Sequence, residues 1–427
     1  MSHITKNKQY ATIPAMSADV WDVIVIGGGP AGMMAAGRAA ERGKKVLLIE
    51  KNDSLGKKLL ITGGGRCNVT NAELDTRKLL SKFKDGGKFL FSSFAEWNVQ
   101  NTLDFFHTRN MPTKIEKELR VFPVSDKAQS VWNVLVDYIK KNKVTILSDS
   151  PVSDFVLEDG KIVGVKVKKD IIKGKSFILA TGGTSRPETG STGDGFKWLK
   201  KIGHTVIEPV PSLVPIAAKD IWIKRLSGVS LNDIKLTVTQ NGEKQSVQKG
   251  RILFTHVGIS GPTILNMSKD IGELLKYGEV KILLDLLPNH DHAKLNSTLQ
   301  EIFKENDKKN FKNSLSGLIP SAMIPIITEL SKIDPDIKCN SITRESRMKL
   351  IELLKNIPLN VHKLLGVDKA IISSGGVLLD EVDFKTMSSR IYPNLFLIGD
   401  ILNIDRPSGG YSLQLCWTTG FVAGNSI

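Results

Sequence analysis

Three glycines near the start of the chain have a spacing typical of dinucleotide-binding proteins. Gly27, Gly29 and Gly32 directly follow the apolar run Val23–Ile26 and give the pattern G-x-G-x-x-G. Such a run is typical of a strand that is buried on both faces of a parallel sheet. Gly27 permits a tight turn, Gly29 lets the backbone approach a pyrophosphate, and Gly32 lets a helix pack closely on the strand. The N-terminus of that helix offers unpaired N–H groups to phosphates.

The residues after these glycines complete a βαβ unit. Met33–Arg42 suits a helix, and Lys45–Ile49 is a second apolar strand. Glu50 ends this strand 18 residues after Gly32, where a carboxylate can accept hydrogen bonds from a ribose diol. The glycines alone would be weak evidence. Strand, helix, second strand and terminal acid together predict a dinucleotide site.

Length and composition limit the class of protein. With 427 residues, 41% of them hydrophobic and 24% charged, the chain resembles a soluble globular protein of two or three domains. The sequence has no apolar run near the ~18 residues that a membrane span needs. Residues 1–20 lack the apolar core of a secretory signal, so we expect a flexible arm there. Three cysteines favour a reducing cytoplasm, and the absence of C-x-x-C and H-E-x-x-H patterns predicts no metal site.

The charge is strongly basic, with a formal net charge of +15. Such a surface can attract nucleic acid, membrane surfaces or anionic small molecules. The lysines are spread widely, for example over Lys140–Lys143 and Lys166–Lys175. A solvated lysine-rich surface and an RNA-binding surface therefore both stay open.

A second glycine-rich stretch follows the βαβ unit. Gly63, Gly64 and Gly65 cannot belong to a regular element, and Arg66, Cys67 and Asn68 come directly after them, bringing a fixed positive charge, a soft side chain and an amide. By itself the stretch could be an ordinary turn. Because it comes soon after the predicted ribose-binding strand, we expect it to cross the reactive end of the cofactor.

Three later segments are expected to return to the same site. The run Ala180-Thr181-Gly182 follows a buried strand, and Gly399-Asp400 follows another at Leu395–Ile398. The third segment, Gly410-Tyr411-Ser412, opens the last helix, whose N-terminus can direct N–H groups at developing negative charge.

The pattern of elements predicts an α/β fold whose nucleotide-binding domain is split in sequence. We expect its first part at 21–204 and its second part at 373–427. Short strands with turns such as Asn241-Gly242 predict an inserted β-barrel at 205–289. Helical periodicity predicts a small helical subdomain at 290–356, and 357–372 return through the insert.

Together these motifs resemble a known group, the bacterial aminoacetone oxidase or BaiN-like NAD(P)/FAD-dependent oxidoreductases. The matching blocks span roughly residues 21 to 424 and read VIGGGPAGMMAA, EKNDSLGKKLLITGGGRCNVTN, RVFPVSDKAQ, ATGG, TGSTGDGF, SLVPI, LFTHVGISGP, SGGV, IGD and GGYSLQ. The resemblance implies FAD as cofactor, a split Rossmann-like FAD-binding domain, and an insert made of a β-barrel and a helical piece.

The resemblance also implies which residues hold the cofactor. The ADP half would lie against Gly27–Gly32 (with Pro30 and Ala31) and Glu50-Lys51, with Lys58 nearby, and Asp400 would face the ribityl–pyrophosphate linker. The isoalloxazine would lie between Gly64–Asn68 and Gly410–Ser412, with Arg66 and Tyr411 as candidate catalytic residues. Ser412 departs from the family, which often has Asn there, and Arg406 adds a positive charge near the ring.

These residues predict a hydride transfer between flavin and a small organic substrate or NAD(P)H. Only one complete fingerprint is present, so NAD(P)H would dock transiently, and reoxidation by oxygen is equally open. Cys67 and Cys416 could form a redox pair only through the fold; two inert thiols are the simpler interpretation. The alternative is a flavoprotein associated with RNA through its basic surface. The oligomeric state is left undetermined.

Overall fold

The computed structural model describes residues 20–366 and 368–427, so the predicted arm at 1–20 lies almost wholly outside the described residues. The chain forms two compact units. Unit 1 contains residues up to Pro211 and from Ala370 onward, and unit 2 contains Ser212–Lys369. The sequence predicts boundaries of the nucleotide-binding domain at 204/205 and 372/373, a few residues from the limits of unit 2.

Unit 1 is built on a sheet whose strand order is β6-β2-β1-β9-β8-β7, with β18 also pairing with β9. The bounds are Thr145–Leu147 for β6, Val46–Ile49 for β2, Trp21–Ile26 for β1, Asp170–Leu179 for β9, Lys161–Val167 for β8, Val152–Glu158 for β7 and Leu395–Leu397 for β18. The pairs among β6, β2, β1, β9 and β18 are parallel, while β7, β8 and β9 pair antiparallel. The predicted α/β Rossmann-like fold is confirmed.

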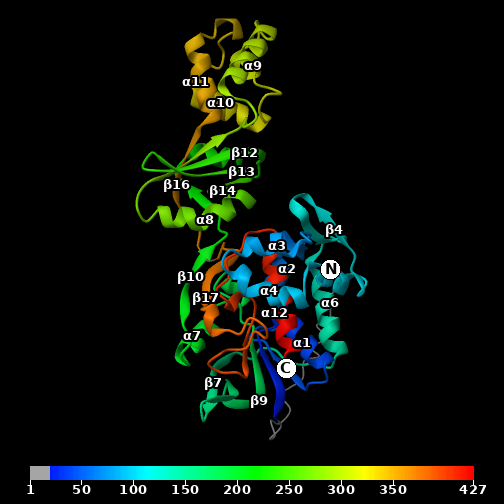
Figure 1. Ribbon diagram of the computed structural model, residues 1–427. Helices are drawn as coiled ribbons and strands as arrows, with labels where there is room; N and C mark the ends of the chain where they lie inside the picture. Colours follow the sequence, from blue (N-terminus) through cyan, green and yellow to red (C-terminus); the bar gives the residue numbers. More distant parts are fainter. Residues whose placement is uncertain (1–19, 367) are drawn as a thin grey trace, which may run out of the picture. The chain divides into compact units, whose positions relative to one another are not determined.

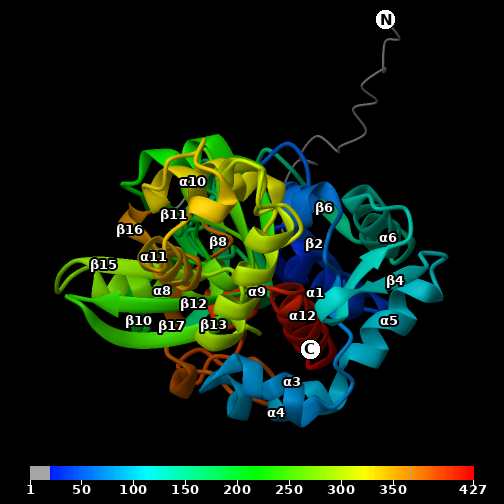
Figure 2. The same ribbon diagram turned by 90° about the horizontal axis from the view of Figure 1, so that it is seen from above.

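Helices pack on this sheet, and the last one pairs with the first. Helix α1 (Pro30–Glu41) lies beside α12 (Tyr411–Asn425) in both views (Figure 1, Figure 2). Further helices of unit 1 are α2 (Lys57–Ile61), α3 (Thr76–Leu80), α4 (Gly86–Glu96), α5 (Val99–His107), α6 (Ala128–Lys141) and α7 (Asp194–Lys201). The two ends of the described chain therefore meet over one core.

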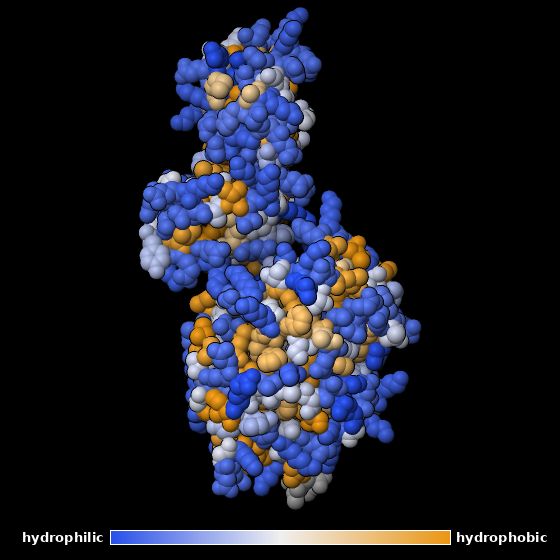
Figure 3. Space-filling view, viewed as in Figure 1, coloured by the Kyte–Doolittle hydropathy of each residue, from blue (hydrophilic) through white to orange (hydrophobic). Residues whose placement is uncertain are grey.

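A small sheet in unit 1 was missed by the sequence analysis. Strands β3 (Thr70–Asn71), β5 (Arg120–Pro123) and β4 (Thr113–Glu116) pair antiparallel in that order. Ile115, Leu119 and Val124 are exposed here, and a hydrophobic patch lies over the region of β4 in Figure 3. A second unpredicted pairing joins β10 (Val206–Ser212) to β17 (Ile372–Val377). It joins the two chain segments of unit 1 at the positions where unit 2 is inserted.

Unit 2 contains a closed barrel with strand order β11-β14-β13-β12-β15-β16. The bounds are Ile216–Ala218 for β11, Ser230–Gln240 for β12, Glu243–Thr255 for β13, Gly258–Ser260 for β14, Val280–Asp285 for β15 and Ile357–Leu364 for β16. Helix α8 (Pro262–Leu274) belongs to this part, and α9 (His292–Glu305), α10 (Ile324–Ser331) and α11 (Arg344–Lys355) follow β15. Barrel and helices share one apolar core.

No helix among residues 20–366 and 368–427 is long and apolar enough to cross a membrane.

Candidate functional site

The glycine fingerprint lies at the turn from β1 to α1, and each glycine has a steric reason. Gly27 has φ +107°, and a Cβ there would come within 2.5 Å of the Ala180 carbonyl oxygen. A Cβ on Gly32 would come within 1.9 Å of the Gly27 oxygen. A Cβ on Gly29 would meet no atom within 4 Å, so open space lies beside the start of α1. The turn thus leaves room for a phosphate at the helix N-terminus.

Glu50 is held in one orientation by backbone donors. It is 7% exposed, and its Oε2 accepts from the Gly28 N–H at 2.7 Å. Its Oε1 accepts from the Asn52 N–H at 2.8 Å. Oε1 also accepts from the Asn52 side-chain Nδ2 at 2.7 Å, whereas Oε2 keeps a further lone pair. The acid at the end of β2 can therefore still accept a hydrogen bond from a ribose hydroxyl.

Residues 189–194, which are far along the chain, are hydrogen-bonded to the residues that follow β2. The Lys51 Nζ donates to Asp194 Oδ2 at 2.9 Å and to Thr192 Oγ1 at 2.5 Å. Asn52 Nδ2 donates to the Thr189 oxygen at 3.1 Å. Lys51 therefore pairs with the carboxylate at the start of α7 and also lines the cavity.

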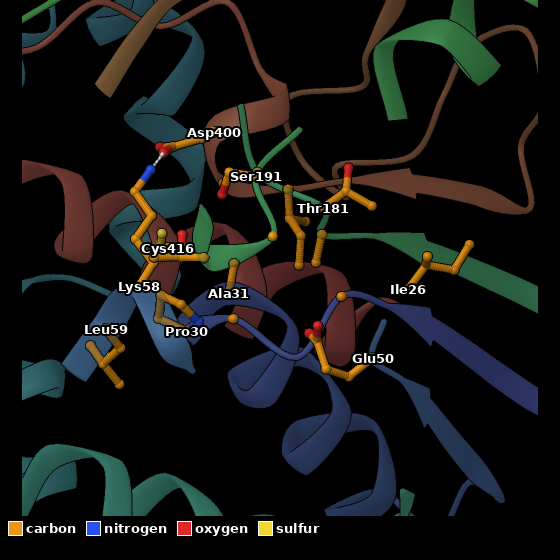
Figure 4. Close-up of a pocket in the computed structure, with 18 of the residues that line it drawn as sticks. Ile26, Pro30, Ala31, Glu50, Lys58, Leu59, Thr181, Ser191, Asp400 and Cys416 are labelled. Atoms are coloured by element: carbon orange, nitrogen blue, oxygen red, sulfur yellow. Dashed lines mark ion pairs between the residues drawn. The ribbon is translucent and has the colours of Figure 1, made fainter. Parts of the chain in front are cut away.

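Asp400 follows β18, and two cations lie beside its carboxylate. Its Oδ2 lies 3.6 Å from the Lys58 Nζ (Figure 4), and its Oδ1 accepts from the Arg406 guanidinium. Although burial raises the pKa of Asp400, the charges of Arg406 and Lys58 outweigh it and lower this pKa overall. The carboxyl is therefore ionised.

The glycine turn, Glu50, Lys51, Lys58 and Asp400 all line one cavity within unit 1. The predicted residues that line it are Gly27, Gly29, Pro30, Ala31, Glu50, Lys51, Lys58, Ala180, Thr181, Gly182, Gly399, Asp400 and Ser412. The structure thus brings together the fingerprint, the hinge after β9 and the end of β18, which are far apart in sequence.

Other predicted site residues do not line this cavity: Gly32, Gly64, Gly65, Arg66, Cys67, Asn68, Gly410 and Tyr411. Arg66 instead donates to Asp126 Oδ1 at 2.8 Å and to Glu116, and its guanidinium stacks on the Phe122 ring at 4.1 Å. The hydrogen bonds to Glu116 and Asp126 raise the pKa of Arg66. Its guanidinium charge is thus paired with two carboxylates.

Tyr411 and the neighbouring glycine serve packing. The Tyr411 ring meets Phe83 edge-on with centroids 5.9 Å apart, and burial raises the pKa of its hydroxyl. A Cβ on Gly410 would come within 2.3 Å of the Thr70 carbonyl carbon. The catalytic roles of Arg66 and Tyr411 stay predictions without support from this geometry.

The two cysteines of the sequence analysis are buried. Cys416 lines the cavity, whereas Cys67 does not, and both are free thiols. Burial raises the pKa of each thiol to about 12. Protonated thiols are poor nucleophiles, which favours the interpretation of two inert cysteines.

Sequence reasoning missed about half of the cavity wall. The missed residues are Ile26, Ile49, Asn52, Leu59, Thr62, Ser150, Val152, Thr189, Gly190, Ser191, Asp194, Trp198, Ile371, Ile372, Ile398, Leu413 and Cys416. One signal was available, because the run Thr189–Gly195 is rich in glycine and leads into α7. The apolar members carry no motif.

The cavity fits FAD by its own chemistry. Open space at Gly29 suits a phosphate, and Glu50 suits a ribose. Thr181 Oγ1 and Asn68 Oδ1 are buried without a hydrogen-bond partner among the described residues. Thr181 lies in the cavity wall, and its hydroxyl lies beside Gly195, where a Cβ would come within 2.3 Å of it. Asp400 and Lys58 offer an acceptor and a cation at another part of the wall.

Comparison with known proteins agrees with this geometry. The HI0933-like protein Rossmann domain model matches residues 21–426. The 3-dehydro-bile acid delta(4,6)-reductase of Clostridium scindens is 29% identical over 405 residues, covering 94% of this chain and 98% of that protein. The ribosomal RNA dihydrouridine synthase of Escherichia coli is 28% identical over 407 residues, covering 95% and 98%.

A solved structure extends the likeness of fold. The open conformation of a flavocytochrome c3 fumarate reductase matches with a TM-score of 0.53 and 16% identity, over 96% of this chain and 78% of that one. At this identity the match concerns the fold alone.

Fold, cavity and relatives define the class, which is that of FAD-dependent oxidoreductases with a Rossmann-like domain. Within this class, the chain belongs to the HI0933-like family. The resemblance stated from the motifs is confirmed.

Proposed function

We propose that this enzyme reduces a carbon–carbon double bond that is conjugated to a carbonyl group. The observation that carries the proposal is the chemistry shared by two relatives that each align over nearly their whole length. One is named as a reductase of a 3-dehydro bile acid and the other as a synthase of dihydrouridine. A 4-ene beside a 3-oxo group and the C5–C6 bond of uracil are both double bonds next to a carbonyl.

In this proposal the chain binds FAD along the cavity of unit 1. The β1–α1 turn and Glu50 hold the adenosine diphosphate half, and Asp400, Lys58 and Ser412 hold the remainder. FAD, when bound, supplies two-electron hydride chemistry. The protein binds and orients the cofactor, and the apolar wall from Ile371, Ile372 and Leu413 excludes water from it.

The electron balance requires a donor. Overall, one NAD(P)H and one proton are consumed, the nicotinamide loses a hydride, and the double bond gains two hydrogens. Among the described residues we find no second nucleotide fingerprint, so the nicotinamide would bind transiently, as the sequence analysis expected.

Anaerobic mixing tests the reductive half of the proposal. NADH or NADPH should bleach the oxidised-flavin absorbance, and a 3-oxo-4-ene steroid or a uracil substrate should restore it without oxygen. Reoxidation by oxygen alone, with an amine substrate as the only effective reductant, would contradict the proposal and favour an oxidase.

A second candidate narrows the substrate to uracil in ribosomal RNA. Its support is the dihydrouridine synthase relatives together with the net charge of +15. Phosphate contacts should make RNA affinity fall steeply with salt. Mass spectrometry of ribosomal RNA from a deletion strain would reveal a missing dihydrouridine, and an unchanged modification pattern would remove this candidate.

A further inference from the structure

Arg406 is the only lysine or arginine that is buried among the described residues, and it does not line the cavity. It is 4% exposed. Burying a charge costs free energy unless hydrogen bonds satisfy it. The hydrogen-bond partners of Arg406 therefore indicate why this charge is buried.

The guanidinium joins three points between the end of β18 and the first turn of α12. Its Nε donates to Ser412 Oγ at 3.0 Å, and Nη1 donates to the Ile404 oxygen at 2.7 Å. Nη2 donates to Asp400 Oδ1. Asp400 and Ser412 both line the cavity. Arg406 therefore holds two cavity residues from behind with one planar group.

The bond to Ser412 has a direction. A hydroxyl is one donor and also an acceptor, and Ser412 uses its acceptor for Arg406. Ser412 donates to no other described residue, so its O–H is available to the cavity. Ser412 is also in the first turn of α12, where the helix dipole favours negative charge.

The charged side chains near Ser412 also favour a negatively charged ligand group. Lys58 and Arg406 carry two positive charges against the one negative charge of Asp400. An excess positive charge and an available O–H donor therefore meet at this part of the cavity wall.

We propose that Arg406 is a positioning residue that makes Ser412 a hydrogen-bond donor to a negatively charged group of FAD, either its pyrophosphate or the ring in its reduced form. This inference rests on the proposed binding of FAD in this cavity.

The test is a double-mutant cycle on the dissociation constant of FAD, measured by titrating apoprotein with FAD. Arg406→Lys keeps the charge beside Asp400 but lacks the Nε–H that binds Ser412. Ser412→Ala removes the donor. Each change should raise the dissociation constant about tenfold, as for loss of one hydrogen bond to a charged group. The double variant should bind as weakly as Ser412→Ala alone, because both changes remove the same bond.

Three results would overturn the proposal: wild-type affinity in Arg406→Lys, wild-type affinity in Ser412→Ala, or effects that multiply in the double variant. Ser412→Thr, which keeps the hydroxyl, should restore most of the affinity. If Arg406→Lys does not fold, Ser412→Ala and Ser412→Thr still test whether the Ser412 hydroxyl binds the cofactor, because they leave the Arg406 bond to Asp400 intact, and wild-type affinity in Ser412→Ala still overturns the proposal.

The midpoint potential of bound FAD distinguishes the two anionic groups. Ser412→Ala lowers the potential if the hydroxyl faces the reduced ring and leaves it unchanged if the hydroxyl faces the pyrophosphate; both agree with the proposal once affinity falls. Wild-type protein that binds no FAD would instead refute the proposed function itself.

Discussion

Glu50 shows how one side chain serves both the fold and the cofactor. Its two oxygens accept from the Gly28 and Asn52 N–H groups, and it also lines the cavity. An amide has one acceptor oxygen, so Glu50→Gln leaves one buried N–H facing an NH2 group. We expect a loss of about 1–3 kcal/mol in the free energy of unfolding, and about tenfold weaker FAD binding since the ribose loses a charged acceptor.

Thermal unfolding and FAD titration measure these two effects. Glu158→Gln is the matched control, because Glu158 is exposed on β7 and outside the cavity. Equal FAD affinity in both variants would show that Glu50 does not contact the cofactor.

The burial of Cys67 and Cys416 predicts that neither thiol reacts readily in the folded protein. Because burial raises the pKa of Cys67 and Cys416 to about 12, both stay protonated at neutral pH. A thiol reagent at pH 8 should therefore label neither residue in the folded protein, while all three cysteines react after denaturation. Rapid labelling of Cys67 or Cys416 in native protein would contradict the burial.

The same pKa values give a pH dependence of stability. Unfolded thiols ionise near pH 9, whereas the folded ones ionise near pH 12. This contribution to stability is therefore present below pH 9 and is lost as the pH rises toward 12.

Arg66 provides a residue-scale test of a sequence-based role. Its guanidinium is paired with Glu116 and Asp126 and lies outside the cavity wall. Arg66→Gln should leave the FAD dissociation constant within about twofold and cost at most about 1 kcal/mol, as for a partly exposed ion pair. A large loss of FAD affinity, with Glu158→Gln as control, would instead support the role implied by the resemblance.

At the scale of elements, the close approach of α12 to α1 depends on two glycines one turn apart. A Cβ on Gly420 would come within 2.6 Å of the Ala31 oxygen, and one on Gly424 within 2.5 Å of the Ala35 oxygen. The contact joins the last helix to the helix that carries the fingerprint. It therefore fixes Ser412, at the start of α12, relative to the glycine turn.

Gly420→Ala should destabilise unit 1 although alanine is the better helix former. The propensity gain is about 1 kcal/mol, and the overpacking against backbone costs about 1–3 kcal/mol. We expect a lower midpoint of thermal unfolding and weaker FAD binding. Lys88→Ala, on the exposed face of α4, is the control and should change neither. An unchanged midpoint for Gly420→Ala would mean that the helices can move apart without cost.

At the scale of the whole molecule, every residue that lines the cavity belongs to unit 1. A chain in which residues 212–369 are replaced by a short Gly/Ser linker should therefore still bind FAD, with a dissociation constant within about tenfold, since no direct hydrogen bond to the cofactor is removed. The pairing of β10 with β17 holds the two ends of the cut together. Flavin absorbance and titration of the purified variant measure this, and a folded protein that stays colourless with added FAD would contradict it.

The sequence by itself determined the βαβ unit, because its signals are local. Strand burial, the glycine turn, the helix and the acid at Glu50 lie within about thirty consecutive residues, where spacing fixes geometry. The sequence also indicated that the segments ending at Gly182 and Asp400 return to the same sheet edge, and the structure places both in the cavity wall. The family model confirms the class to which these motifs pointed.

Only the tertiary structure decided which polar groups face the cavity and which are satisfied elsewhere. The pairing of Lys51 with Asp194 spans 143 residues, and that of Arg66 with Asp126 spans 60. Arg406 and Ser412 are six residues apart, yet their bond depends on how the turn after β18 packs against α12. A charge or a hydroxyl in a sequence has no fixed partner, because its partner is set by long-range packing that no local pattern records.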